Sequence, residues 1–129
     1  MKSRPLKLGL TVLQGGLWVF GQVAVHAESF STPNSAVSSG VNSVAIGESA
    51  TASGNSSAAV GYSSTASQDS SVSIGNGSQA TAASATAIGT AATASNANSM
   101  AIGTSSLASK SNSTSIGAGS QATAVNGSS

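Results

Sequence analysis

Residues 44–57 read VAIGESATASGNSS, and residues 58–71 read AAVGYSSTASQDSS. The same arrangement returns four more times, so that six Ile-Gly or Val-Gly steps follow one another at intervals of 14 residues. The six units are residues 44–57, 58–71, 72–85, 86–99, 100–113 and 114–127. Self-similarity at a fixed period, without an insertion, is typical of a repeat architecture in which identical units stack on one another.

Positions within the unit, counted from position 1 at Val44, differ in what they tolerate. Position 3 is Ile or Val, position 4 is always Gly, position 9 is always Ala, and position 2 is only Ala or Ser. Apolar and small residues alternate around position 3, which is the two-residue period of a strand. The fixed Gly suits a turn or a backbone with positive φ, and a second extended segment can surround position 9. One unit therefore predicts strand, turn, strand and turn, and the fold class is all-β.

Identical units stack most simply as a solenoid in which each strand pairs in parallel with its counterpart one unit later, about 4.8 Å away. We expect position 3 to fill the narrow interior from one side and position 9 from the other. The predicted core residues are Ile46, Val60, Ile74, Ile88, Ile102 and Ile116 at position 3, and Ala52, Ala66, Ala80, Ala94, Ala108 and Ala122 at position 9.

So thin a core buries little apolar surface against the entropy of ordering a coil. We therefore expect several chains to associate. The small Ala/Ser residues of position 2 predict a smooth outer face for this contact. The spacing alone does not give the number of chains.

The composition excludes several classes of function. The chain of 129 residues has no Cys and a single His, His26, so neither a disulfide framework nor a thiolate metal site is possible, and no cofactor is expected. Beyond residue 27 it holds one lysine, Lys110, and three carboxylates that lie far apart in sequence, a net charge of −2. We therefore expect no enzyme, no small-molecule substrate and no nucleic-acid binding.

The N-terminus resembles an export signal. Lys2, Arg4 and Lys7 precede an uncharged, mostly apolar stretch, and Val25-His26-Ala27 places small residues at the −3 and −1 positions of a cleavage site. This pattern predicts a secretory signal peptide that is cleaved after Ala27 and directs the chain across the inner membrane. The expected divisions are residues 1–27 for the signal, 28–43 for a lead-in or N-terminal cap, 44–127 for the repeats, and 128–129 for the start of a truncated further repeat.

Three units carry a longer motif, N-S-x-A-I-G-x-x-S. Residues 98–106 match it in full, residues 42–50 match except for Ala50 at the end, and residues 112–120 depart only at Ser115. The array over about residues 42–127 resembles the head domain of trimeric autotransporter adhesins, the YadA-like family of Gram-negative surface proteins. The six repeats in one register make this resemblance specific.

The resemblance implies a left-handed parallel β-roll of about six coils with two short strands each, assembled as a homotrimer. It also implies adhesion to a host matrix protein such as collagen, or to neighbouring cells. The location would be the cell surface or outer membrane if a C-terminal anchor exists, and otherwise extracellular; because neither stalk nor barrel follows the repeats, we expect a fragment or a separately secreted repeat protein. The candidate ligand contacts are the outward Asn and Ser positions of the best-matching repeats, Asn42, Ser43, Asn98, Ser99, Ser106, Asn112, Ser113 and Ser120.

Other interpretations stay open. The repeats are also consistent with an inert spacer or coat that projects another module, which the sequence beyond Ser129 would reveal. A disordered Ser/Ala/Gly linker is a further possibility. The hydroxyl rows that begin at Thr51 and Ser53 are expected to be solvated strand faces, with ice or carbohydrate recognition as the alternative.

Overall fold

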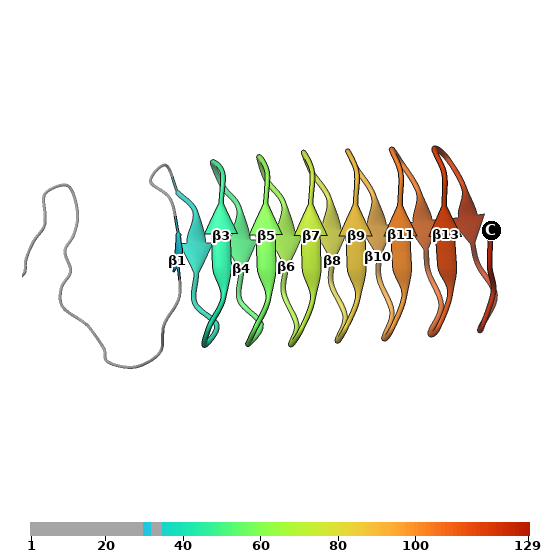
Figure 1. The fold of residues 1–129 in the computed structure, drawn as a ribbon, viewed down its shortest axis with the longest axis horizontal. Helices are drawn as coiled ribbons and strands as arrows, with labels where there is room; N and C mark the ends of the chain where they lie inside the picture. The colour runs from blue at the N-terminus through green and yellow to red at the C-terminus, as the bar shows by residue number, and fades with distance from the viewer. Residues whose placement is uncertain (1–29, 32–34) are drawn as a thin grey trace, which may run out of the picture.

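The computed structural model describes residues 30, 31 and 35–129, which form a parallel β-solenoid (Figure 1). Each turn of the solenoid, here called a coil, takes 14 residues and contributes one strand to each of two seven-stranded sheets. The odd-numbered sheet consists of β1 (Phe30–Ser31), β3 (Val44–Ile46), β5 (Ala58–Val60), β7 (Val72–Ile74), β9 (Thr86–Ile88), β11 (Met100–Ile102) and β13 (Thr114–Ile116). The even-numbered sheet consists of β2 (Val37–Ser38), β4 (Thr51–Ala52), β6 (Thr65–Ala66), β8 (Gln79–Ala80), β10 (Thr93–Ala94), β12 (Leu107–Ala108) and β14 (Gln121–Ala122). The predicted all-β parallel solenoid is confirmed.

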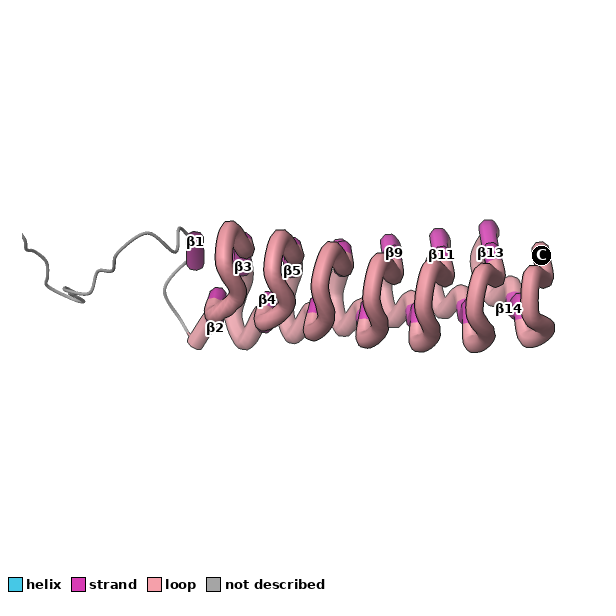
Figure 2. The backbone as a smooth tube through the Cα atoms, turned by 90° about the horizontal axis from the view of Figure 1, so that it is seen from below, coloured by secondary structure: helices cyan, strands magenta, loops and turns pink. Residues whose placement is uncertain are grey.

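The strands of each sheet pair with a constant shift of one repeat. Ile74 of β7 pairs with Ile88 of β9, which in turn pairs with Ile102 of β11. Each repeat position therefore forms a straight row along the solenoid, and the coils follow one another as evenly spaced turns (Figure 2). β1 and β2 extend both sheets into the segment 28–43.

Two turns close each coil. Turn 1 spans positions 4–7 and turn 2 spans positions 11–14, which are residues 47–50 and 54–57 in the first unit. The third residue of each turn has positive φ, 62° at Ser49 and 58° at Ser56. The amide of the fourth residue donates to the carbonyl of the first, at 3.1 Å in turn 1 and 3.3 Å in turn 2. The coil thus consists of two similar halves, a regularity finer than the period seen in the sequence.

The invariant glycine of position 4 has a backbone reason. Gly89 has φ +131°, a conformation that side chains rarely adopt. A Cβ atom there would lie 2.6 Å from the carbonyl oxygen of Gly103 in the next coil. The predicted turn glycine with positive φ is confirmed. The position-4 glycines stack on one another in a row along the solenoid, here called the glycine ridge.

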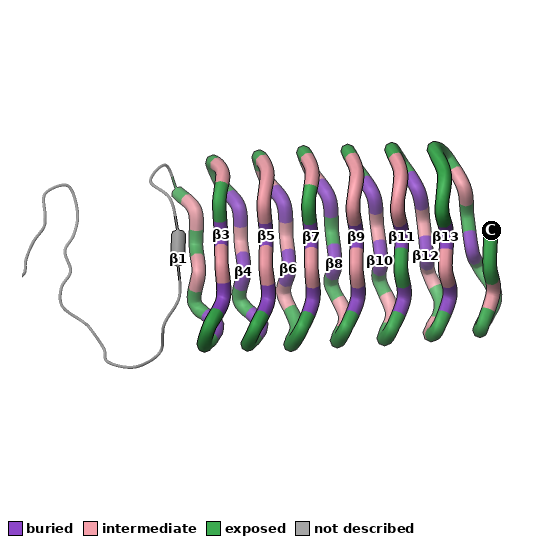
Figure 3. The backbone as a smooth tube through the Cα atoms, in the orientation of Figure 1, coloured by how far each residue is buried: buried purple, intermediate pink, exposed green. Residues whose placement is uncertain are grey.

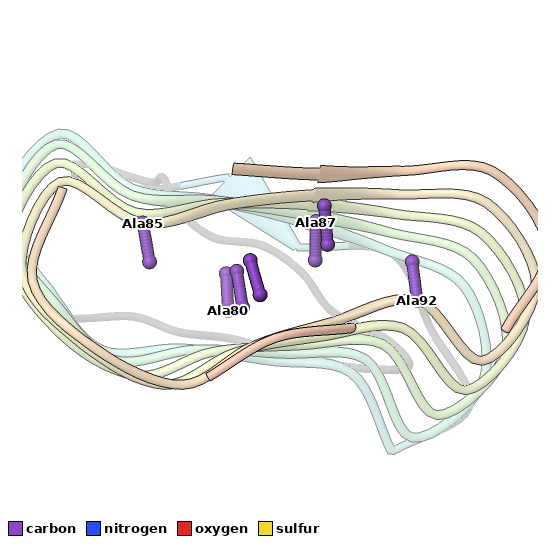
Figure 4. Close-up of a cluster of buried hydrophobic side chains, with 7 residues drawn as sticks. Ala80, Ala85, Ala87 and Ala92 are labelled. Atoms are coloured by element: carbon purple, nitrogen blue, oxygen red, sulfur yellow. The ribbon is translucent and has the colours of Figure 1, made fainter. Parts of the chain in front are cut away.

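The interior is lined by positions 2 and 9 from the two sheets and by positions 7 and 14 from the two turns. In Figure 4, Ala87 and Ala80 lie between the sheets, with Ala85 and Ala92 toward the two turns, and all four are fully buried. The largest fully buried side chains among the described residues are serines. The predicted burial of position 9 is confirmed, since its six alanines are 0–3% exposed.

The predicted burial of position 3 is wrong. Ile46, Ile74 and Ile116 are 37%, 40% and 58% exposed, and Val60, Ile88 and Ile102 are only half-buried. Side chains alternate along a strand, so position 2 points inward and positions 1 and 3 point outward. The interior admits only Ala and Ser because four columns of side chains meet in it. Figure 3 shows this alternation of burial along the odd-numbered strands.

The same alternation overturns the expected association face. Position 2 is interior, with Ala59, Ser73 and Ala87 all fully buried, so it offers no outer surface to another chain. The predicted signal peptide and its cleavage after Ala27 lie outside the described residues. Those residues contain no helix that combines the length and apolarity needed to span a bilayer.

Candidate binding surface

The outer face of the odd-numbered sheet carries an apolar row, here called the isoleucine stripe. Register stacks its members directly above one another, from Ile46 through Ile116. Position 1 lies beside the stripe and is also apolar in several coils, with Met100 37% exposed. The stripe consists of Ile46, Val60, Ile74, Ile88, Ile102 and Ile116. A contiguous apolar row on the outside of a solenoid marks an interaction surface more than scattered apolar residues do.

The outer face of the even-numbered sheet is uncharged, and it is polar except at Leu107 of β12 and the exposed Val37 of β2. Its first row, position 8, is Thr51, Thr65, Gln79, Thr93, Leu107 and Gln121, and its second, position 10, is Ser53, Ser67, Thr81, Ser95, Ser109 and Thr123. These residues are half-buried or exposed. The two faces of the solenoid therefore differ in chemistry: one presents isoleucine and the other presents hydroxyl and amide groups.

Three candidate asparagines lie on the surface at position 13. Asn42, Asn98 and Asn112 are exposed and have φ of 59°, 57° and 59°. Asparagine tolerates this left-handed conformation better than most residues. The turn backbone thus explains why asparagine recurs here, and ligand contact by these side chains stays a prediction.

Four candidate serines are not on the surface. Ser43, Ser99, Ser106 and Ser113 are 0–1% exposed, so the prediction that they face outward is wrong. Their hydroxyls serve the turns: Ser113 Oγ, for example, donates to the carbonyl of Lys110 at 2.6 Å. A buried hydroxyl needs a partner, and the turn supplies one three residues earlier in the chain.

The remaining candidate serine, Ser120, is half-buried in turn 1 of the last full coil. Its Oγ donates to the carbonyl of Gly117 at 2.9 Å and lies 2.6 Å from Ser115 Oγ. Its hydroxyl is therefore held by the turn and by the interior. Of the eight candidates, only the three asparagines present side chains that a ligand reaches freely.

Turn 2 contains a clamp between coils that sequence reasoning missed. The amide of Val41 donates to Asn55 Oδ1 at 3.0 Å, and the amide of Asn55 donates to Asp69 Oδ1 at 2.9 Å. Each side chain therefore caps the amide that precedes it by one full coil. The available signal was the succession of Asn55 and Asp69 at position 12.

The charged groups of the described residues are few and dispersed. Glu48 is exposed on turn 1, and Asp69 and Lys110 are exposed on turn 2 of different coils. No group of three His, Cys, Asp or Glu residues that could hold a metal ion occurs in this part of the chain. The chemistry that the surface offers is repetition of small neutral contacts at the strand spacing.

Comparison with known families decides what this repeat is. The family model of the YadA head domain repeat (2 copies) matches residues 38–64, 52–78, 80–106 and 108–128. The chain belongs to the YadA head repeat family. The resemblance drawn from the sequence motif is confirmed, and the chain is an adhesin-type surface repeat. A search of the curated proteins found no significant match.

The geometry gives each letter of the YadA head motif a place. In Ala101-Ile102-Gly103, the alanine points into the interior, the isoleucine points outward, and the glycine forms the ridge of turn 1. The motif therefore encodes a small interior, an apolar exterior stripe and a tight turn together.

Proposed function

We propose that this YadA head array is the binding part of a surface adhesin, displayed outside the cell as a homotrimer of left-handed coils. The family supplies the adhesive role, and the isoleucine stripe is the observation that carries the assembly. The proposed ligand is a host matrix protein such as collagen, or the surface of a neighbouring cell.

The exposed stripe supports assembly through the odd-numbered sheet. Its most exposed members, Ile74 and Ile116, are 40% and 58% exposed in the single chain. Covering such side chains stabilises by roughly 25 cal/mol for each Å² of apolar surface removed from water. The interior contributes little of this kind, because it contains only Ala and Ser side chains. Three copies with their stripes facing a common axis would supply the missing apolar core.

The same arrangement leaves the polar surfaces for a ligand. With the odd-numbered sheet covered, the Thr/Ser/Gln rows of the even-numbered sheet face outward. Each contact on these rows is neutral and weak, but the rows repeat in every coil and in every copy. Simultaneous engagement of many weak contacts raises the overall affinity well above that of one contact.

One observation favours a spacer as the second candidate function. At position 5 on turn 1, the exposed residue changes in nearly every coil, as in Glu48, Tyr62, Asn76 and Thr90. A ligand that makes the same contact with every coil cannot bind through these position-5 side chains, because they differ from coil to coil. A spacer needs only the conserved interior and stripe.

Solid-phase binding of the full chain to immobilised collagen, fibronectin and laminin tests the adhesive role. We expect saturable binding by trimers to at least one of them. The test variant is Ile74→Lys with Ile88→Lys, which breaks the stripe and leaves the polar faces intact, and its binding should be much weaker because valency is lost. Trimers by light scattering without saturable binding to any matrix protein would favour the spacer.

A further inference from the structure

Turn 2 presents a row of backbone amides at position 12. The first amides of the row are hydrogen-bonded within the described part of the chain, and the later ones are not. The amides of Val41 and Asn55 are capped by the side chain of the next coil, Asn55 and Asp69 respectively. Beyond Asp69 the position-12 side chains are too short or too apolar to repeat this cap. Within the described residues, no hydrogen bond is formed by the amides of Asp69, Ala83, Ala97, Ser111 and Val125.

These amides are open to a partner. Asp69, Ala83, Ala97 and Val125 are exposed, and Ser111 is half-buried. The clamp in the earlier coils identifies the chemistry that suits them, since a carboxylate or carboxamide oxygen at 2.9–3.0 Å occupies the equivalent amides there. A partner for this edge therefore carries oxygen acceptors.

Turn 1 carries such acceptors in the same coils. Position 5 is Tyr62, Asn76, Thr90 and Thr104 in the first four of the five units that hold the open amides, and all four side chains are exposed. The backbone amides of position 5 also lack an acceptor among the described residues. Position 5 nevertheless carries an oxygen-bearing side chain in all four units, whereas position 12 does so only at Asp69 and Ser111. In the last unit the Val125 amide is also open, but Ala118 occupies position 5 and the acceptor is missing, so four of the five units have both partners.

A second copy of this chain is the partner that fits both rows. Successive coils are separated by the strand spacing, about 4.8 Å, and only a partner with the same spacing keeps four donors opposite four acceptors. A parallel copy has that spacing by construction. In a cyclic assembly with the isoleucine stripes inward, unlike edges meet, because a ring is built from heterologous contacts.

We propose that the open amides of turn 2 in one copy bind the position-5 side chains of turn 1 in the next, coil by coil. This contact rests on the proposed homotrimer and adds to it the interaction that closes the ring and fixes its register. Within one coil, the Thr90 side chain of one copy lies against the Ala97 amide of its neighbour.

Cysteine cross-linking tests this contact directly, because the natural chain has no cysteine. Thr90→Cys and Ala97→Cys are placed together in the full chain. The two sites lie on opposite turns of one coil, separated by β10 (Thr93–Ala94), and a disulfide requires Cα atoms within about 7 Å. Oxidation of the double variant should therefore give covalent dimers and closed trimers on a non-reducing gel, and each single variant should remain monomeric there.

Light scattering on the same samples distinguishes failure of the edge contact from failure of the homotrimer. Trimers in solution without a disulfide in the double variant would overturn the edge contact and leave the trimer standing. Cross-links in either single variant would also overturn it, because like edges would then meet. A natural chain that is monomeric would overturn the homotrimer and the edge contact together.

A second variant needs no cross-link. Ala97→Asn introduces a side-chain oxygen that can accept from the backbone amide of Ala83, one coil earlier, as Asn55 accepts from the backbone amide of Val41. The Ala83 amide then has a partner in its own chain and no longer binds the neighbouring copy. We expect the concentration at which the trimer dissociates to rise about tenfold, with an unchanged far-UV spectrum. Ala97→Ser, the residue found at Ser111, is the control and should leave dissociation unchanged. Equal dissociation of both variants would contradict the proposal.

Discussion

Ser73 and Ser78 share a hydroxyl hydrogen bond of 2.7 Å inside the solenoid, between β7 (Val72–Ile74) and the turn that follows it. Ser78 Oγ also donates to the carbonyl of Gly75 at 3.0 Å. The hydrogen of Ser78 is therefore committed, and Ser73 is the donor in the pair. Position 2 is serine in two units, and in each of them position 7 is serine as well.

This pairing predicts unequal costs for single and double substitutions. Ser78→Ala leaves the buried Ser73 hydroxyl without its acceptor and should lower the free energy of unfolding by about 1–3 kcal/mol. Ser73→Ala with Ser78→Ala recreates the Ala87 and Ala92 pair of the next coil, and should lie within about 1 kcal/mol of the natural chain. Denaturation followed by circular dichroism measures both. A double variant less stable than Ser78→Ala would contradict the pairing.

The narrow interior predicts that larger side chains at interior positions strongly destabilise the solenoid. Ala94→Leu inserts three carbons into a fully buried site and should destabilise the chain by about 1–3 kcal/mol or more. The matched control is Thr93→Leu, whose side chain points outward in the row where Leu107 occurs naturally. Thermal unfolding of the two variants should differ clearly; equal melting temperatures would mean that the interior is wider than described.

Glycine at position 4 should be irreplaceable where another coil follows. Gly89→Ala places a Cβ atom 2.6 Å from the Gly103 carbonyl oxygen at φ +131°, so we expect the variant to fail to form a regular solenoid. Gly119→Ala is the control, because its φ is +71° and nothing lies within 4 Å of the added Cβ. Its cost should be about 1–2 kcal/mol, that of a left-handed alanine. Native-like circular dichroism for Gly89→Ala would refute this packing.

The clamp at position 12 predicts a difference between two substitutions of one residue. Asp69→Ala removes the acceptor of the Asn55 amide and should lower stability by about 0.5–1.5 kcal/mol. Asp69→Asn keeps an oxygen at the same place and should have a smaller effect. Hydrogen exchange at the Asn55 amide provides the residue-specific readout: it should accelerate in Asp69→Ala only.

Much of the fold follows from the sequence because the repeat aligns equivalent positions. The constant spacing predicts parallel pairing, and the invariant Gly predicts a turn with positive φ, as at Gly89. Strand alternation does not, however, decide which face of the strand points into the interior. Apolar character alone predicts that Ile74 points inward and Ser73 outward. The structure makes the opposite choice because positions 7 and 14 also point inward, and four columns together leave room only for Ala and Ser.

The candidate contacts were less predictable. Ser43 and Ser113 are polar residues in turns, for which an outward side chain is the ordinary expectation. Each instead donates to a carbonyl three residues earlier, at 2.7 Å and 2.6 Å. This local hydrogen bond offsets the cost of burying the hydroxyl. The side chain of Asn55 likewise acts across coils, a relationship that emerges only once residues 14 apart are placed side by side.

We propose that a solenoid with an Ala/Ser interior depends on other copies to cover its isoleucine stripe. Light scattering of the full chain and of two double variants tests this dependence. The stripe variant is Ile74→Lys with Ile88→Lys, and the control, Thr65→Lys with Thr93→Lys, adds the same charge to the even-numbered face. We expect three times the chain mass for the natural protein and the control, and a single chain for the stripe variant. A monomeric natural protein at high concentration, or a stripe variant that still forms trimers, would contradict it.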